Sequence, residues 1–452
     1  MKALLHAAAL GFVVVQVSFA ADNSSLRDQL ALAGEAADSH AQIELIRRIL
    51  EQTPSDHALR GQLASLWLGI DDFAMTEREI NGWPDAPASL RAQVLAEVLY
   101  RRDGKKAAAI AMLEERLAEN PDDLETARQL AQYLNASGEQ RKVIDLLMKT
   151  PGVGNDAELL VLRAGAKRSQ MDFDGALKDF AQAEQTDPES SAVTSQRAAF
   201  ERLATGLKNI RLASAAMKQH PGDAGPVISR AHWYLYAGVP APALEDANAV
   251  LDKVPGSTAA LLLSAQAQGA MGKLAFREAR ENLAIDLSKS LPLDALGRVL
   301  KYDLALLKNP GDAAALAGRS AELAGLQQDL LALKDADAAL KIDAKNAPAH
   351  LERISALARL ERRDDAAAAL REFAAAKPAK ALLATALSAL TQANFRASQF
   401  DEALDDINQA ISLKPAAPYY KQRAAILTRL DRSDEAAQDL ARAAQLEKGT
   451  RP

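Results

Sequence analysis

Residues 398–415 read SQFDEALDDINQAISLKP, and residues 171–188 read MDFDGALKDFAQAEQTDP. The two stretches share a phenylalanine, two alanines and a final proline at equivalent positions, although more than two hundred residues separate them. In the second copy Ala176, Phe180 and Ala183 are four and three residues apart, so they lie on one face of a helix. Each stretch therefore predicts a helix with one apolar face that ends before its proline.

Isolated prolines recur at a regular spacing along the chain. Pro188, Pro221 and Pro255 are separated by 33 and 34 residues. A fixed period of this length indicates a repeat protein, in which each repeat buries its apolar face only against its neighbours.

Composition supports an all-α fold. Hydrophobic residues make up 48% of the 452 residues but aromatic residues only 4%, and no segment alternates apolar and polar residues as a half-buried strand would. No linker rich in Ser, Gly and Pro divides the chain into separate bundles. We therefore expect a solenoid of stacked helix-turn-helix units.

Within each period two helical faces can be read. In the last one, Tyr420, Arg423, Ala424 and Leu427 share one face, and a second face follows a short turn. This pattern, with small residues at the helix crossing and a proline at the end, resembles the tetratricopeptide repeat, and the resemblance implies a right-handed superhelix with an inner groove lined by the first helices. The expected units are 23–54, 57–86, 88–121, 124–155, 157–188, 190–221, 224–255, 258–290, 313–344, 347–378, 384–415 and 417–448.

The repeat rhythm breaks in residues 282–312, where LPLDALGRVLKYDLALLKNP reads as an extra or lengthened helix. The expected organisation is therefore a signal peptide (1–20), an N-terminal solenoid (21–281), an irregular connector (282–312) and a C-terminal solenoid (313–448).

The first twenty residues have the layout of a secretory signal. Lys2 precedes an apolar run, and Ser18-Phe19-Ala20 suits cleavage after Ala20. The alternative is an uncleaved membrane anchor, but the run is shorter than the ~20 residues that span a bilayer. Cysteine is absent, which excludes disulfides and thiolate sites. Together these features predict a periplasmic or secreted protein of a bacterium.

The residues offer little support for catalysis. No HExxH, Walker loop, nucleophile elbow or dinucleotide fingerprint occurs. Acidic pairs such as Asp405-Asp406 lie near the start of an expected helix, where the helix dipole favours negative charge. We expect no enzyme activity, no catalytic or metal site and no cofactor. A net charge of −6 argues against nucleic acid as a partner.

Candidate partner-binding residues come from two features of the expected groove. Basic residues recur late in the first helices and would attract an acidic peptide or anionic glycan, or else they complement helix dipoles. The aromatic stretch AHWYLYAGVP contributes His232, Trp233 and Tyr236, which would stack on a ligand or form a structural patch. The basic candidates are Arg168, Arg202, Arg359, Arg396 and Arg429 late in the first helices, and Lys421 at the fifth position of its unit.

The tetratricopeptide resemblance also limits the expectations for partners. Only Lys421 fits the carboxylate clamp of tetratricopeptide co-chaperones, so that clamp is not reproduced. The sequence thus predicts a scaffold of the bacterial envelope that binds protein segments or helices in its groove. The alternative is a periplasmic scaffold component of exopolysaccharide synthesis or export, with an outer-membrane channel or an anionic glycan as partner.

Overall fold

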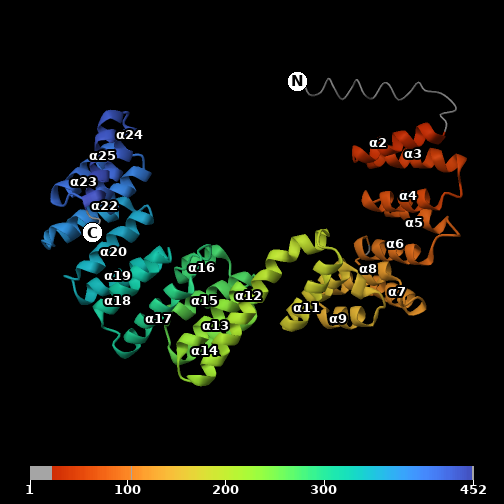
Figure 1. The fold of residues 1–452 in the computed structure, drawn as a ribbon, viewed down its shortest axis with the longest axis horizontal. Coiled ribbons are helices and arrows are strands. Elements are labelled where there is room, and N and C mark those ends of the chain that lie inside the picture. The colour runs from red at the N-terminus through yellow and green to blue at the C-terminus, as the bar shows by residue number, and fades with distance from the viewer. Residues whose placement is uncertain (1–22, 103, 450–452) are drawn as a thin grey trace. The chain divides into compact units, whose positions relative to one another are not determined.

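The computed structural model describes residues 23–102 and 104–449, and every regular element in that part of the chain is helical (Figure 1). The expected signal peptide lies outside the described residues. The chain separates into two compact units, Met1–Phe200 and Glu201–Pro452. The first contains α2 (Asn23–Glu35), α3 (Ser39–Gln52), α4 (His57–Gly69), α5 (Phe73–Asn81), α6 (Ala88–Arg101), α7 (Lys106–Glu119), α8 (Leu124–Ala136), α9 (Gln140–Lys149), the 3-10 turn η1 (Val153–Asn155), α10 (Ala157–Ser169) and α11 (Phe173–Thr186).

The second unit continues the same pattern of antiparallel helix pairs, and the boundary between the units falls inside α12 (Ser191–Gln219). It contains α13 (Ala224–Tyr236), α14 (Pro240–Lys253), α15 (Thr258–Ala270), α16 (Phe276–Leu283), α17 (Leu293–Lys308), α18 (Ala313–Gly325), α19 (Asp329–Ile342), α20 (Ala347–Arg359), α21 (Arg363–Ala375), α22 (Lys380–Arg396), α23 (Phe400–Leu413), α24 (Ala417–Arg429) and α25 (Ser433–Gly449).

The starts of the first helices follow from local hydrogen bonding. Asp56, Asp123 and Asp312 each occupy the position before a first helix, and their carboxylates accept the backbone N–H three residues further on. A short polar side chain at this position satisfies an N–H group that the helix itself cannot bond. In these three hairpins the sequence therefore specifies where the first helix starts.

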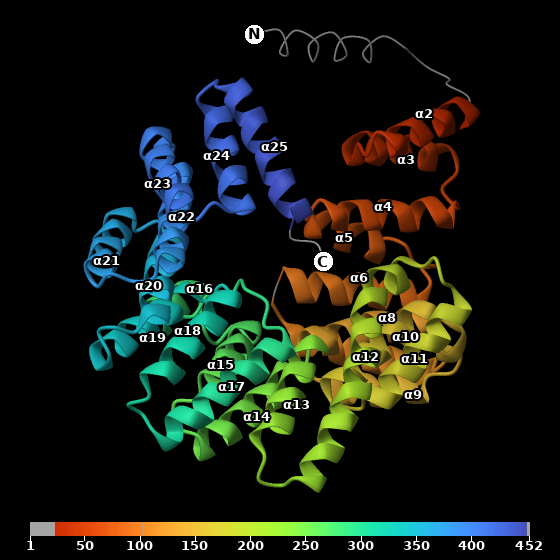
Figure 2. The ribbon, with the colours of Figure 1, turned by 60° about the vertical axis from the view of Figure 1, so that its left-hand side comes forward.

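The alanines permit the close crossing of the two helices in each hairpin. Ala164 of α10 and Ala176 and Ala183 of α11 are all 0% exposed, and Ala403 and Ala410 of α23 are buried to the same degree. Side chains this small let the helices approach closely, so the hairpins stack in chain order within each unit (Figures 1 and 2). The first helices of neighbouring hairpins also touch, as α4, α6 and α8 do.

A recurring ion pair ties the two helices of a hairpin together. Arg163 of α10 donates to Asp179 of α11 from Nε and Nη2, both at 2.8 Å, and both residues are largely buried. The same spacing of 16 residues joins Arg230 to Asp246, Arg319 to Asp335 and Arg423 to Asp439.

The expected hairpin at 190–221 is wrong. Residues 191–219 form one continuous helix, α12. This segment contains no proline, and its only glycine, Gly206, stays helical. A Cβ at Gly206 would lie 2.7 Å from the Ala237 Cβ, so glycine here serves close packing of α12 against the end of α13 rather than a turn.

The irregular segment has a definite structure. Helix α16 is short, residues 284–292 are non-helical, and α17 follows as the extra helix that the sequence predicts. Helix α17 packs against α13, α15 and α18. We call residues 284–292 the connector. No helix within the described ranges is long and apolar enough to cross a membrane.

Candidate functional site

The first helices α4, α6 and α8 enclose a surface hollow of about 340 Å³ in the first unit. Glu125, Arg128 and Gln132 are the second, fifth and ninth residues of the expected unit 124–155. We call this site the first-helix hollow. Its lining residues are Ser65, Leu68, Leu90, Gln93, Val94, Glu97, Glu125, Arg128, Gln129 and Gln132.

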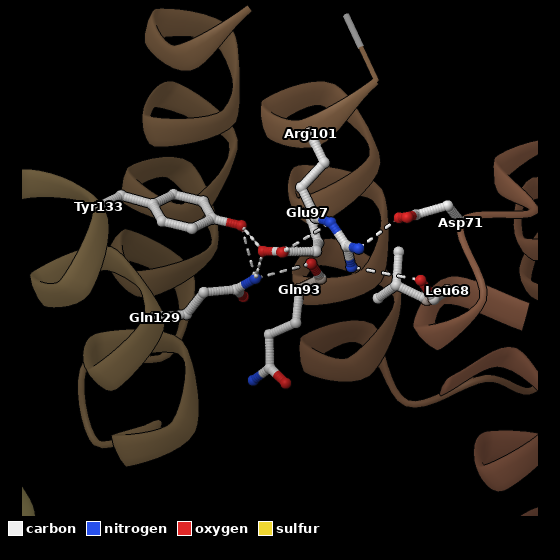
Figure 3. Close-up of polar contacts among 7 residues, drawn as sticks. All are labelled: Leu68, Asp71, Gln93, Glu97, Arg101, Gln129 and Tyr133. Atoms are coloured by element: carbon white, nitrogen blue, oxygen red, sulfur yellow. Dashed lines mark hydrogen bonds and ion pairs between the residues drawn. The ribbon is translucent and has the colours of Figure 1, made fainter. Parts of the chain in front are cut away.

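A hydrogen-bond network joins α6 and α8 at one wall of the first-helix hollow (Figure 3). The Tyr133 hydroxyl donates to the Glu97 carboxylate, and Gln129 Nε2 donates to the Gln93 carbonyl at 3.0 Å and also contacts Tyr133 Oη at 3.0 Å. Burial, together with the Glu97 carboxylate, raises the pKa of the Tyr133 hydroxyl. Tyr133 therefore stays a hydrogen-bond donor at physiological pH.

Arg101 extends the network to the preceding hairpin. Its guanidinium donates to the Leu68 carbonyl at 3.2 Å and to the Asp71 carboxylate, and its Nε lies 3.8 Å from Glu97 Oε1 (Figure 3). Groups from three successive hairpins are thus fixed relative to one another. A site whose polar groups are already positioned loses less conformational entropy when it binds a partner.

Arg128 forms the corresponding link toward α10. It lies 2.5 Å from Glu125, 2.6 Å from Asp156 and 3.2 Å from Glu158. The hollow thus presents both charges, while the exposed side chains of Ser65 and Gln132 add neutral donors and acceptors. This mixture can pair with the alternating N–H and C=O groups of an extended peptide.

In the second unit, the predicted aromatic residues form one cluster. Trp233 packs edge-on against His232 and Tyr236, with ring centroids 5.1 and 5.3 Å apart. Tyr236 is exposed, whereas His232 and Trp233 are half-buried.

The connector covers part of this region. Burial lowers the pKa of His232, while a hydrogen bond to the Leu291 backbone raises it, and burial has the larger effect. Gln266 of α15 donates to the Lys289 carbonyl at 2.6 Å, and a Cβ at Gly269 would lie 2.9 Å from Leu287 Cδ1. The chain therefore places its own non-helical segment against the first helices α13 and α15.

The predicted basic residues have different surroundings. Arg359 pairs with Asp329 at 2.6 Å, and Lys421 pairs with Glu447 at the same distance. The structure gathers Arg359 and Arg396 at one cavity in the second unit. The others lie apart: Arg168 over the Phe200 ring at 5.5 Å, Arg429 over the Phe395 ring at 6.0 Å, and Arg202 exposed on α12.

The sequence reasoning missed the polar network of the first-helix hollow and the recurring Arg–Asp pairs. The signal for the pairs is present, because arginine recurs at position seven of a unit with aspartate 16 residues later. Tyr133 and Glu97 carry no comparable pattern, since their contact depends on how neighbouring hairpins stack. Residues 23–102 and 104–449 contain no group of three or more histidine and acidic side chains placed to hold a metal ion.

The chain is similar to several solved structures, each at low sequence identity. No protein-family model and no curated protein sequence matches it. Among solved structures, MamA from Desulfovibrio magneticus RS-1 is 22% identical over 35% of this chain and 88% of its own, with a TM-score of 0.30. One chain of the APC/C hetero-tetramer Cut9–Hcn1 is 13% identical over 94% of both chains, with a TM-score of 0.31. A tetratricopeptide repeat protein from Parabacteroides merdae is 16% identical over 64% of this chain and 93% of its own (TM-score 0.29).

The architecture of the chain is of the tetratricopeptide type. Helical hairpins of about 34 residues follow one another on either side of α12, several of them with a capped first helix and buried alanines where the two helices cross. This agrees with the fold class that the sequence predicts.

Proposed function

We propose that this protein is a non-enzymatic scaffold that binds an extended segment of a protein partner in the first-helix hollow. The observation that carries the proposal is the preorganised network of Glu97, Arg101, Gln129 and Tyr133, which fixes three successive hairpins around a polar hollow. Solenoids expose long surfaces of this kind, and mixed donors and acceptors suit a peptide backbone.

A display experiment tests this binding mode. Peptides from a random library displayed on phage are selected on the purified protein, and the affinity of enriched peptides is measured for two variants. Ser65→Trp fills the first-helix hollow, whereas Ala111→Trp places the same bulk on the exposed surface of α7. We expect the first variant to weaken binding at least tenfold and the second to leave it unchanged. Equal affinities for both variants contradict the proposal.

We also propose that the scaffold acts in the bacterial cell envelope. The support is the N-terminal sequence, with Lys2, an apolar run and Ser18-Phe19-Ala20, together with the absence of cysteine. N-terminal sequencing of the protein from a periplasmic fraction should begin at Ala21. A start at Met1 in the membrane fraction would favour the retained anchor instead.

A further inference from the structure

The second unit contains a cavity of about 600 Å³ that is separate from the first-helix hollow. The end of α16, the connector, the turn between α18 and α19 and the ends of α20 and α22 form its walls. We call it the turn cavity. Four basic side chains line it, namely Arg280, Lys289, Arg359 and Arg396.

The four basic side chains differ in whether an acidic side chain pairs with them. Arg359 holds Asp329 at 2.6 Å, and Lys289 lies 3.9 Å from Asp286. Arg280 and Arg396 form no ion pair within the described part of the chain, and both are exposed. Two guanidinium groups at this cavity therefore keep their donors available for an oxyanion, which a guanidinium can bind through two parallel N–H groups.

The charge of the lining limits the kind of anion. Three carboxylates, those of Asp286, Asp329 and Glu361, stand among the four cations, so the lining carries a net charge of plus one. A doubly charged phosphate would meet repulsion from these acids, whereas a single carboxylate balances the excess. The volume is within the range of sites that hold a small ligand or the end of a peptide.

The wall of the turn cavity is fixed in place. Gln328 is 1% exposed, accepts the Asp286 N–H at 2.8 Å and donates to the Asp286 carbonyl at 3.0 Å. The Gln328 side chain therefore makes both backbone hydrogen bonds that a neighbouring strand would make. In this way it holds Asp286 against the α18–α19 turn. A preformed site of this kind binds with a smaller entropy cost.

We propose that the turn cavity binds a single carboxylate group, which Arg280 and Arg396 hold through charge-assisted hydrogen bonds. The carboxylate belongs to the C-terminus of a protein partner or to a small organic acid. The site is independent of the first-helix hollow, because none of its residues lines that hollow.

Saturation-transfer NMR tests the proposal with defined probes on the purified full chain. The probe is acetyl-Gly-Ser-Ala-Ala, with either a free carboxylate or a C-terminal amide. We expect the acid to bind at least tenfold more tightly than the amide, and the double variant Arg280→Gln/Arg396→Gln to lose this preference. Propionate that displaces the peptide at equal concentration identifies a small organic acid as the source, and failure to displace it identifies a peptide terminus.

Matched variants separate this site from general charge effects. Arg371→Gln removes an exposed arginine on α21 that does not line the turn cavity, and it should bind the acid as the original chain does. Ser65→Trp should also bind the acid normally, so failure of the first-helix hollow and failure of the turn cavity are distinguishable. Equal binding of acid and amide, no binding of either probe, or full affinity in the double variant overturns the proposal.

Discussion

Arg319 and Asp335 lie 16 residues apart and form a two-pronged ion pair, with Nε to Oδ2 at 2.7 Å and Nη2 to Oδ1 at 2.8 Å. The remaining Nη1 of Arg319 donates to Asp303 of α17 at 2.9 Å. One guanidinium thus joins α17, α18 and α19. Because Asp303 also accepts from Ser257 and from the Ala259 N–H, the link reaches α15 as well.

Removal of Arg319 should strongly destabilise the second unit. The side chains of Arg319 and Asp303 are 13% and 0% exposed, so Arg319→Ala leaves carboxylates buried without their partner. We expect a loss of about 3–5 kcal/mol in the free energy of unfolding. Denaturant unfolding measures it, with Arg277→Ala as control, because the Arg277–Glu281 pair is 86% and 59% exposed and should contribute less than about 1 kcal/mol. Equal losses for both variants contradict the argument.

The helix crossings should not tolerate a large charged residue. Ala176 and Ala403 are both 0% exposed, so Ala176→Arg or Ala403→Arg forces bulk and charge between packed helices. We expect each variant to lose several kcal/mol, of the order of 3 or more. Ala425→Arg on the exposed face of α24 is the control and should unfold as the original chain does. Unchanged thermal unfolding of Ala403→Arg would show that the crossing does not depend on a small residue.

Asp406 should make stability depend on pH. Burial, together with the nearby acids Asp405 and Glu402, raises its pKa to about 6, although a hydrogen bond from Asn394 lowers it. The folded state therefore holds a proton that the unfolded state releases near pH 4, so the free energy of unfolding falls as pH rises from about 4 to about 6.

Substitution isolates this effect. Asp406→Asn should be more stable than the original chain above pH 6, and this gain should shrink to nothing near pH 4. Asp405→Asn, an exposed neighbour, should show no such gain. Thermal unfolding between pH 4 and pH 8 measures the difference, and a gain that is constant with pH would contradict the assignment.

Gln328 should control the order of the connector. Gln328→Ala removes both hydrogen bonds to the Asp286 backbone and leaves the partly buried Asp286 N–H without its acceptor, at a cost of about 1–3 kcal/mol, while the Asp286 carbonyl keeps the Lys289 N–H. Hydrogen exchange at the Asp286 amide should become faster by at least tenfold. Gln327→Ala is the matched control, because Gln327 is exposed in the same turn. Unchanged exchange in Gln328→Ala would show that other contacts hold the connector.

Much of the fold could be predicted because its determinants are local. The aspartate caps, the alanine spacing and the prolines each specify a boundary or a crossing within a single repeat, and the sequence places the extra helix near α17 correctly. The expected hairpin at 190–221 failed because the period continues there while no turn residue interrupts the helix. Periodicity alone does not distinguish a long helix from two short ones.

The site was less predictable because its contacts cross repeats. The Tyr133–Glu97 hydrogen bond and the Gln328–Asp286 pair each join residues more than 30 positions apart, and only the stacking of hairpins brings them together. Arg359 and Arg396 were candidates for partner binding because of their positions late in the first helices. The sequence did not predict the cavity that they share, because residues of the connector form one of its walls. Whether the aromatic cluster of His232, Trp233 and Tyr236 binds a partner stays a prediction.

Site-specific photo-crosslinking tests the central claim most directly. A benzoylphenylalanine at Gln132, in the first-helix hollow, is compared in living cells with the same probe at Ala111 on α7. The account predicts a discrete crosslinked protein from Gln132 that is absent from Ala111 and disappears when Ser65→Trp is added. Identical products from the two positions, or no product from Gln132, would contradict partner binding in the first-helix hollow.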